Sequence, residues 1–322
     1  MKAIVAATYG GPEVMVVRDV PTPSPGAGQV LVRVHAAGVN PADWHLMTGT
    51  PRLVRLQTGF RRPKQPIPGV DLAGVVEAVG DGVSDLAVGD EVFGGGNGSY
   101  AEAAVAKATS LARKPASVSW VQAAALPIGA LTALQGLRKV GPLDGRHVLV
   151  NGAAGGVGTF AVQLAVSMGA RVTGVCSTAN LELVKGLGAE RVVDYTVMSA
   201  LSGTHRYDVI LDMIGNHSLG ACRRALTPGG RYVLVGEAST GDLLGPMRRL
   251  LAAKLRFLFG RRKAVALLAT TKAADLAEVA ALVEAGAIAP VVERTYRLEE
   301  SSAAMAHLHS HHVRGKLVIE IA

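Results

Sequence analysis

Residues 147–165 decide the fold, and they read HVLVNGAAGGVGTFAVQLA. A short apolar run predicts a buried β-strand, which is followed by a glycine turn and an amphipathic helix. In such a unit, glycines let the backbone approach a pyrophosphate, and the helix N-terminus supplies N–H donors. Ala153 stands at the usual tight-turn glycine, which leaves Gly155 for close approach and Gly158 for helix–strand packing. The predicted dinucleotide contacts are Ala154, Gly155, Gly156, Val157 and Gly158. The alternative is a packing turn that binds nothing.

The composition is that of a globular protein with ample length for hydrophobic cores. The 322 residues are 49% hydrophobic and 18% charged. Two cysteines, Cys176 and Cys222, give no disulfide framework and too few ligands for a structural zinc site. Residues 115–137 and 147–170 carry no charge, but glycine and polar residues interrupt both stretches, which indicates buried core. The N-terminus runs directly into a strand-like pattern, and we therefore expect a cytoplasmic protein.

The net charge of +8 is concentrated in two segments, residues 52–64 and 248–263. The second segment contains no acidic residue. Such segments attract phosphorylated ligands, nucleic acid or anionic membranes, although a solvated surface is the plainer interpretation. The second segment also fits a basic amphipathic helix lying on a membrane surface. We expect no nucleic-acid partner and no stable membrane insertion.

The pattern of elements changes near residue 119. Residues 1–118 consist of short strands and turns, and they predict a small, partly open β-barrel. Beyond them, strands and helices alternate, which predicts a parallel, doubly wound sheet. Expected strands cover residues 171–176, 191–194, 207–212, 231–236 and 315–321, and expected helices lie near 181–187, 274–284 and 299–309.

Eight motifs in a fixed order carry a family resemblance, at residues 38–43, 68–74, 88–92, 123–133, 152–158, 193–195, 226–231 and 314–318. With these motifs the chain resembles the medium-chain dehydrogenase/reductase superfamily, in its zinc-independent quinone-oxidoreductase-like branch. The resemblance implies an α/β fold with a GroES-like β-barrel catalytic domain at 1–118. It also implies a Rossmann NADP-binding domain at 119–268, a C-terminal return to the first domain at 269–322, and a homodimer.

Zinc is the first question for this superfamily. The resemblance implies that zinc-dependent relatives carry a Cys at Asn40 and a His at Val70. Their third ligand falls in residues 115–137, which contain neither Cys nor His. Because catalytic zinc needs about three Cys, His or carboxylate ligands, we expect no zinc in this chain.

Cofactor preference depends on the end of the second strand of the doubly wound sheet. A carboxylate there favours NAD, whereas this chain has Cys176-Ser177-Thr178. Hydroxyl groups can bond a phosphate, and the resemblance places an aromatic residue, Tyr195, beside it. We therefore expect NADP, although related sequences often carry an arginine where this chain has Ala179. Further expected cofactor contacts are Asn216 and Gly236 in the nucleotide-binding domain and Lys316 near the phosphates.

Chemistry without a metal requires groups that orient the nicotinamide and polarise the acceptor. The resemblance favours three catalytic candidates, Asn40, His45 and Thr132. Asn40 is equally a turn asparagine before Pro41, His45 a packed polar residue, and Thr132 a threonine at a helix start. We expect a structural hydrogen-bonding role for Asp71.

The expected function is an NADPH-dependent, zinc-independent reductase of quinones or α,β-unsaturated carbonyl compounds. Asn40 and His45 would stabilise the oxyanion, and His45 or solvent would deliver the proton. The alternatives are an NADP-dependent alcohol dehydrogenase and a non-catalytic, NADPH-sensing binding protein. Four C-terminal histidines are expected to be surface residues and not a metal cluster: His307, His309, His311 and His312.

Overall fold

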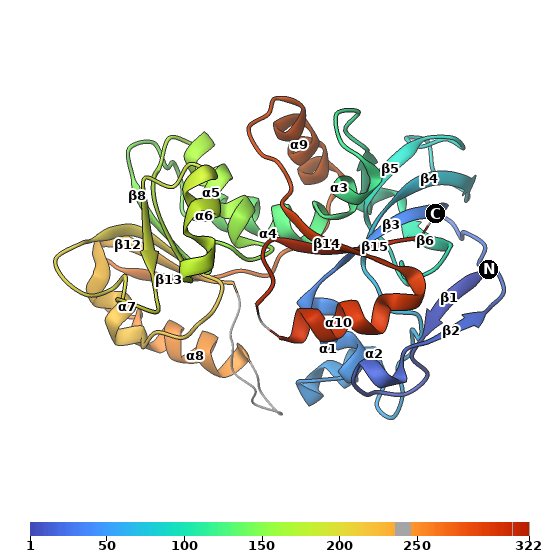
Figure 1. The fold of residues 1–322 in the computed structure, drawn as a ribbon, viewed down its shortest axis with the longest axis horizontal. Helices are drawn as coiled ribbons and strands as arrows, with labels where there is room; N and C mark the ends of the chain where they lie inside the picture. The colour runs from blue at the N-terminus through green and yellow to red at the C-terminus, as the bar shows by residue number, and fades with distance from the viewer. Residues whose placement is uncertain (236–245, 311, 322) are drawn as a thin grey trace. The chain divides into compact units, whose positions relative to one another are not determined.

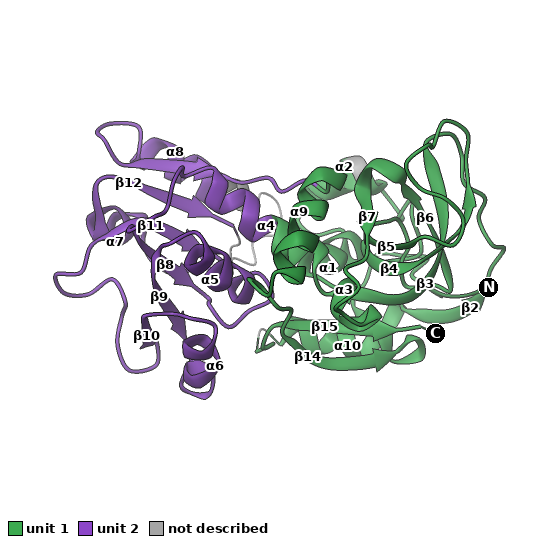
Figure 2. Cartoon of the chain, turned by 90° about the horizontal axis from the view of Figure 1, so that it is seen from above, with its two compact units in different colours: residues 1–131, 271–322 green, residues 132–270 purple. Residues whose placement is uncertain are grey.

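The computed structural model describes residues 1–235, 246–310 and 312–321, and the chain divides into two compact units (Figure 2). Unit 1 contains Met1–Leu131 and Thr271–Ala322, and unit 2 contains Thr132–Thr270. The first boundary differs from the expected one at residue 118. The reason is that helix α3 (Trp120–Ala124) packs against strands β3, β4 and β15 of unit 1.

Unit 1 is built on a mixed seven-stranded sheet with the order β14-β15-β3-β4-β5-β7, in which β6 also pairs with β3. The β14–β15 pair is parallel and the other pairs are antiparallel. The strands are β3 (Gln29–Val39), β4 (Asp71–Val79), β5 (Glu91–Gly95), β6 (Ala103–Lys107), β7 (Leu111–Arg113), β14 (Val292–Arg297) and β15 (Lys316–Glu320). A separate antiparallel pair is formed by β1 (Lys2–Val5) and β2 (Val16–Asp19).

The helices of unit 1 are α1 (Pro41–Thr48), α2 (Arg55–Thr58), α3, α9 (Ala273–Glu284) and α10 (Ser301–His309), and α4 (Pro127–Arg138) crosses into unit 2. One core cluster joins the two ends of the chain, because Met47 of α1 and Tyr100 pack with Met305 of α10 and Leu317 of β15. Helix α1 was not predicted from the sequence. Its start has a recognisable signal, since Asn40 precedes Pro41 at the first helical position.

Unit 2 is a six-stranded parallel sheet with the order β10-β9-β8-β11-β12-β13. This is the doubly wound order expected of a dinucleotide-binding sheet. Its strands are β8 (His147–Asn151), β9 (Arg171–Cys176), β10 (Arg191–Asp194), β11 (Tyr207–Asp212), β12 (Leu226–Leu234) and β13 (Lys263–Ala266). Strand β12 begins five residues before the expected start at 231, and neither β13 nor β14 was predicted.

Helices cover both faces of this sheet (Figure 1). They are α5 (Gly158–Ser167), α6 (Leu181–Gly186), α7 (Leu219–Ala225) and α8 (Pro246–Arg256). Cys222 of α7 and Phe257 after α8 pack on one face with Leu149, Ile210 and Tyr232 of the strands. The charge-free stretches of the sequence thus form buried core elements. Among the described residues, no helix is long and apolar enough to cross a membrane.

Candidate active site

The glycine turn joins β8 to α5 inside unit 2. Gly152 has a φ of +87°, which a glycine adopts without strain. A Cβ atom at Gly158 would lie 2.0 Å from the carbonyl oxygen of Gly152, so packing requires a glycine there. The N–H groups of Gly152 and Ala153 donate to the carbonyl of Val175 at 3.2 and 2.9 Å. These contacts fix the turn against β9.

Gly155 differs from Gly158 in what surrounds it. A Cβ atom at Gly155 would approach no heavy atom closer than 3.5 Å, and that atom is the Gly152 carbonyl oxygen. This is an ordinary contact, so the fold itself does not require a glycine at this position. Residues 154–158 lead directly into the first turn of α5. The N–H groups of Gly156 and Val157 have no backbone partner among the described residues. The turn can therefore hold a pyrophosphate.

A carboxylate lies at the edge where the 2′-phosphate of NADP was expected. Asp194 ends β10 and stands opposite Cys176 in the sheet. Its Oδ2 accepts a 2.5 Å hydrogen bond from the Thr178 hydroxyl, and its Oδ1 accepts from the Thr196 hydroxyl at 2.7 Å. These bonds hold the pKa of Asp194 below its ordinary value, so the group is ionised at neutral pH. The sequence pattern pointed only to the end of β9, and the acid comes from the neighbouring strand.

Ser177 and Tyr195, also expected at this edge, each have a group available to a ligand. The Ser177 hydroxyl oxygen accepts from the Asn180 amide at 3.1 Å, which leaves the hydroxyl hydrogen for a ligand. Tyr195 donates its backbone N–H to Cys176 at 3.0 Å, and its side chain is 54% exposed. Ser177 and Tyr195 can therefore contact a nucleotide, whereas the Thr178 hydroxyl is already bonded to a carboxylate.

Asn216 belongs to a network at the carboxyl ends of β8 and β11. The side-chain amide of Asn151 donates to Asn216 Oδ1 at 2.9 Å and to Asp212 Oδ1 at 2.7 Å. Asp212 Oδ1 also accepts the N–H groups of Ile214 and Gly215. The network fixes residues 212–216 at the edge of a parallel sheet where ligands bind. Asp212 was missed at the sequence level, although it ends a predicted strand.

The second carboxylate oxygen of Asp212, Oδ2, has two contacts of its own. Tyr232 donates its hydroxyl to Asp212 Oδ2 at 2.7 Å, and Arg249 Nη2 lies 3.6 Å from the same oxygen. Burial and the adjacent carboxylate raise the pKa of Tyr232 well above its usual value, so it stays a neutral donor. The expected contact Gly236, which follows β12, lies outside the described residues.

In unit 1, Asn40 is buried at the start of α1. Only 1% of the residue is exposed. Its side-chain Nδ2 donates to Asp71 Oδ2 at 2.9 Å and to the Gly38 carbonyl at 3.4 Å, and its Oδ1 accepts from Lys316 Nζ. The amide atoms of Asn40 are therefore bonded within unit 1. This geometry does not favour the expected direct contact with a substrate oxygen.

Lys316 forms a buried ion pair and does not extend toward solvent. Its Nζ lies 3.9 Å from Asp71 Oδ2 and donates to Asn40 Oδ1 at 2.5 Å. Lys316 starts β15 and reaches Asn40 because Leu317 pairs with Val39 of β3. Burial lowers the pKa of Lys316 and raises that of Asp71 to about 6, while the lysine opposes the latter shift. The expected contact of Lys316 with cofactor phosphates is not favoured by this position.

A second buried carboxylate, Asp43, extends this cluster. Its Oδ2 accepts the Asn40 N–H at 2.8 Å and the Tyr100 hydroxyl at 3.0 Å. Its Oδ1 is buried with no hydrogen-bond partner in the described structure. Burial, together with the charge of Asp71, raises the pKa of Asp43 to about 7. Sequence reasoning missed Asp43 and Tyr100, although Asp43 stands at the third helical position, where a side chain can bond back to the helix start.

The two other catalytic candidates differ in exposure. His45 lies on α1 with an exposed ring, and its Nδ1 donates to the Thr50 carbonyl at 2.7 Å. In the neutral ring this leaves the lone pair on Nε2. Thr132 is 8% exposed near the start of α4. These contacts do not test the catalytic role expected of His45 or Thr132, which stays a prediction.

The C-terminal histidines make separate contacts. His307 Nδ1 lies 2.7 Å from the Tyr296 hydroxyl, and the ring of His309 stacks on Trp44 at 3.9 Å. His311 is outside the described residues. Within the part of the chain that the structure describes, no group of three or more His, Cys, Asp or Glu side chains is arranged to hold a metal ion.

Two family models match the chain. One is described as an alcohol dehydrogenase GroES-like domain and matches residues 26–116, and the other, described as a zinc-binding dehydrogenase, matches residues 187–319. Human quinone oxidoreductase is 33% identical over 335 residues, which cover 99% of this chain and 97% of the human protein.

Solved structures agree with these matches. The quinone oxidoreductase from Coxiella burnetii has a TM-score of 0.87 and 30% identity, covering 100% of this chain and 99% of that one. A mycobacterial protein complexed with NADPH has a TM-score of 0.82 and 30% identity, covering 99% and 100%.

Together, the GroES-like unit and the doubly wound sheet define a two-part NAD(P)H-dependent oxidoreductase, which confirms the predicted fold class. The chain belongs to the medium-chain dehydrogenase/reductase superfamily, in its quinone-oxidoreductase-like branch.

Proposed function

We propose that the chain is an NADPH-dependent, zinc-independent reductase that transfers hydride to quinones or α,β-unsaturated carbonyl compounds. The observation that carries zinc independence is the buried ammonium group of Lys316, beside Asn40 and Asp71. Asn40 stands where zinc-dependent relatives carry a Cys. A cation already bonded there makes a second, divalent cation electrostatically unfavourable. Val70, at the position of the relatives' His, has no donor side chain, so these residues do not fit a catalytic zinc.

The residues of unit 2 do fit a nicotinamide nucleotide. The turn after β8 can hold a pyrophosphate, and Ser177 and Tyr195 present a hydroxyl and an aromatic ring at the ribose edge. When bound, the nucleotide supplies the hydride. The mycobacterial neighbour that was solved with NADPH supports NADP as the cofactor. Asp194 opposes a 2′-phosphate, so we expect the preference for NADPH over NADH to be small.

Without a metal, catalysis depends on positioning and on proton delivery. We assign Asn40 as a positioning residue, because its amide joins Lys316 to Asp71. His45 delivers a proton from Nε2 only as the imidazolium, because its Nδ1 hydrogen is held by Thr50. In the neutral form of His45, solvent protonates the product oxygen. Thr132 remains a candidate for lining the nicotinamide site.

An acceptor panel tests the proposed reaction. We expect NADPH oxidation with a 1,4-quinone, a 2-alkenal and an enone, and none with a saturated aldehyde. Turnover of the saturated aldehyde instead would favour an alcohol dehydrogenase. Tight NADPH binding with no turnover of any acceptor would contradict the proposal. The variant His45→Gln should retain hydride transfer at a reduced rate, because solvent can replace the imidazole as the proton source.

We also propose a homodimer, which rests on the family resemblance. Light scattering of the purified chain should give twice the mass of one chain, which is 33.2 kDa. A monomeric mass would contradict the dimer.

A further inference from the structure

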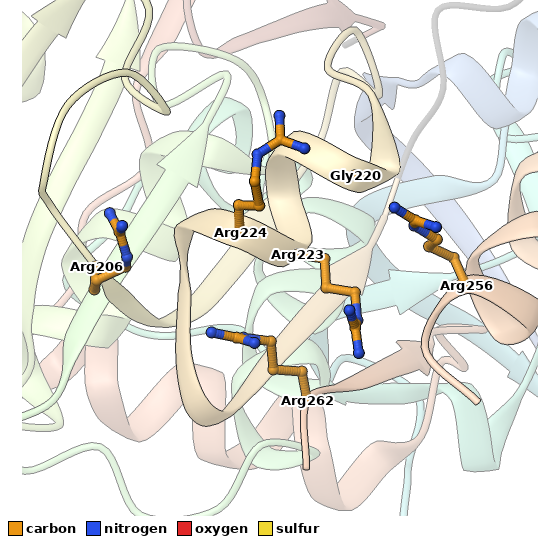
Figure 3. Close-up of a pocket in the computed structure, with 6 residues that line it drawn as sticks. All are labelled: Arg206, Gly220, Arg223, Arg224, Arg256 and Arg262. Atoms are coloured by element: carbon orange, nitrogen blue, oxygen red, sulfur yellow. The ribbon is translucent and has the colours of Figure 1, made fainter. Parts of the chain in front are cut away.

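Five arginine side chains line one pocket of unit 2, which has a volume of about 230 Å³ (Figure 3). The lining residues come from helices α7 and α8 and from the loops that precede β11 and β13, and they are Arg206, Gly220, Arg223, Arg224, Arg256 and Arg262. A Cβ atom at Gly220 would lie 3.5 Å from Arg256 Nη2 and 3.6 Å from Arg224 Nη1. Two guanidinium groups, from α7 and α8, therefore both lie close to Gly220.

The pocket lies at the edge of the sheet opposite the proposed cofactor site. Arg206 directly precedes β11, and Arg262 directly precedes β13, so both mark the amino ends of parallel strands. The glycine turn follows the carboxyl end of β8, the edge where doubly wound sheets bind nucleotides. The arginine pocket is thus not part of the cofactor site.

Backbone carbonyl groups hold three of these side chains in place. Arg223 Nη2 donates to Phe259 at 3.0 Å, and Arg262 Nε donates to Leu226 at 2.9 Å. Arg206 Nη1 donates to the His205 carbonyl at 2.9 Å. Such bonds orient a guanidinium group without neutralising it. In addition, Arg223 Nε is buried and has no hydrogen-bond partner among the described residues.

No acidic side chain in the described part of the chain forms an ion pair with any of the five arginines. Like charges gathered in one place repel one another, and a bound anion relieves that repulsion. A guanidinium group presents its donors in a planar fork that matches two phosphate oxygens. The charge and the geometry of the pocket both favour phosphate groups.

We propose that this pocket binds a compact, multiply charged phosphate ligand of the diphosphate or triphosphate class. Its volume is below the range of about 300–1,000 Å³ typical of sites for whole drug-sized molecules. This favours a phosphate chain, or a phosphorylated headgroup, over a complete nucleotide. A single compact pocket also differs from the extended basic stripe that follows a nucleic-acid backbone.

Calorimetric titration of the full chain with tripolyphosphate tests the site. The variant R224Q/R256Q removes two exposed arginines that form no backbone hydrogen bond within the described part of the chain, so the fold should persist. We expect saturable binding by the unchanged protein and at least a tenfold higher Kd for this variant. The control R18Q/R61Q makes the same charge change at exposed positions of unit 1 and should bind like the unchanged protein. NADPH binding should be equal in all three.

Three results would overturn the proposal: non-saturable binding, equal affinity of R224Q/R256Q, or an equal loss in the control. Displacement of tripolyphosphate by single-stranded oligonucleotides, with affinity rising with their length, would also overturn it in favour of nucleic acid. Sedimentation with phosphatidylinositol bisphosphate vesicles, lost in R224Q/R256Q, would support the site with a lipid headgroup as the source. Tripolyphosphate binding without sedimentation would support a soluble ligand.

Discussion

The buried residues Asp43, Asp71 and Lys316 are the most unusual feature of unit 1 at the scale of single side chains. All three are at most 3% exposed. Burial favours the neutral form of each group. It raises the pKa of Asp43 to about 7 and that of Asp71 to about 6, and it lowers the pKa of Lys316. Such a cluster contributes little net stability, since desolvation offsets the attraction. We therefore assign it to holding Asn40 and the start of α1 in place.

The raised pKa of Asp43 predicts a pH-dependent stability. The unfolded carboxyl titrates near 3.8 and the folded one near 7, so the folded state binds the proton more tightly. The stability from this group is present below about pH 4 and is lost as the pH rises toward 7. Asp43→Asn removes this titration, and its amide oxygen can still accept from Asn40 and Tyr100. The Tm of this variant relative to the unchanged protein should rise between pH 4.5 and 8.

The matched control is Asp81→Asn at an exposed position, which should leave the pH profile of Tm unchanged. Parallel profiles for Asp43→Asn and the unchanged protein would contradict the assignment.

Asp194 predicts a measurable effect on cofactor choice. Replacing it by Asn removes a negative charge at the ribose edge while retaining an acceptor for Thr178. The ratio of kcat/KM for NADPH over NADH should rise by about fivefold, which corresponds to about 1 kcal/mol for one screened charge pair. Glu190→Gln, just before the amino end of the same strand, is the control. An unchanged ratio in Asp194→Asn would place the 2′-phosphate away from Asp194.

At the scale of elements, the glycine turn contains two glycines to which the sequence pattern assigns different roles, packing for Gly158 and close approach of a ligand for Gly155. Gly158 is required by packing against the Gly152 carbonyl, whereas the surroundings of Gly155 tolerate a Cβ atom. A glycine that the fold does not need suggests close approach of a ligand.

Gly155→Ala should therefore weaken NADPH binding by about tenfold or more, since a methyl group would stand between backbone and pyrophosphate. Its Tm should shift by no more than a few degrees, because surface substitutions usually change stability by only about 0.5 kcal/mol. The matched control is Gly186→Ala in α6, where a Cβ atom meets no atom within 4 Å. Equal NADPH affinity of Gly155→Ala and the control would contradict close approach at Gly155. Both quantities can be followed by fluorescence titration and thermal unfolding.

Local patterns predicted most elements of unit 2, because the inner strands β8, β9 and β11 are mainly apolar and glycines mark the turns after β8, α5 and α6. They missed α1, whose polar and apolar residues do not follow a helical period, and whose start is marked only by Asn40, Pro41 and Asp43. They also missed β13 and β14. Strand β13 has only four residues and β14 is largely exposed, so neither shows a continuous apolar run.

For the whole molecule, the order of motifs predicts the class of protein, but it does not predict which side chains contact one another in the candidate site. Asn40 and Lys316 are 276 residues apart, and only the pairing of β15 with β3 brings them together. Likewise, the acid at the ribose edge comes from β10, and no inspection of the end of β9 reveals it. Contacts between distant segments thus revise the roles expected of Asn40, Lys316 and Thr178.

Zinc independence can be tested by comparing the enzyme before and after metal removal. The protein is treated with a strong chelator and its zinc content is determined. Its rate of NADPH oxidation with a 1,4-quinone is then compared with that of untreated protein. We predict an equal rate, with no gain when zinc is added back. Loss of the rate on chelation, and its return with one equivalent of zinc, would show instead that the reductase depends on zinc.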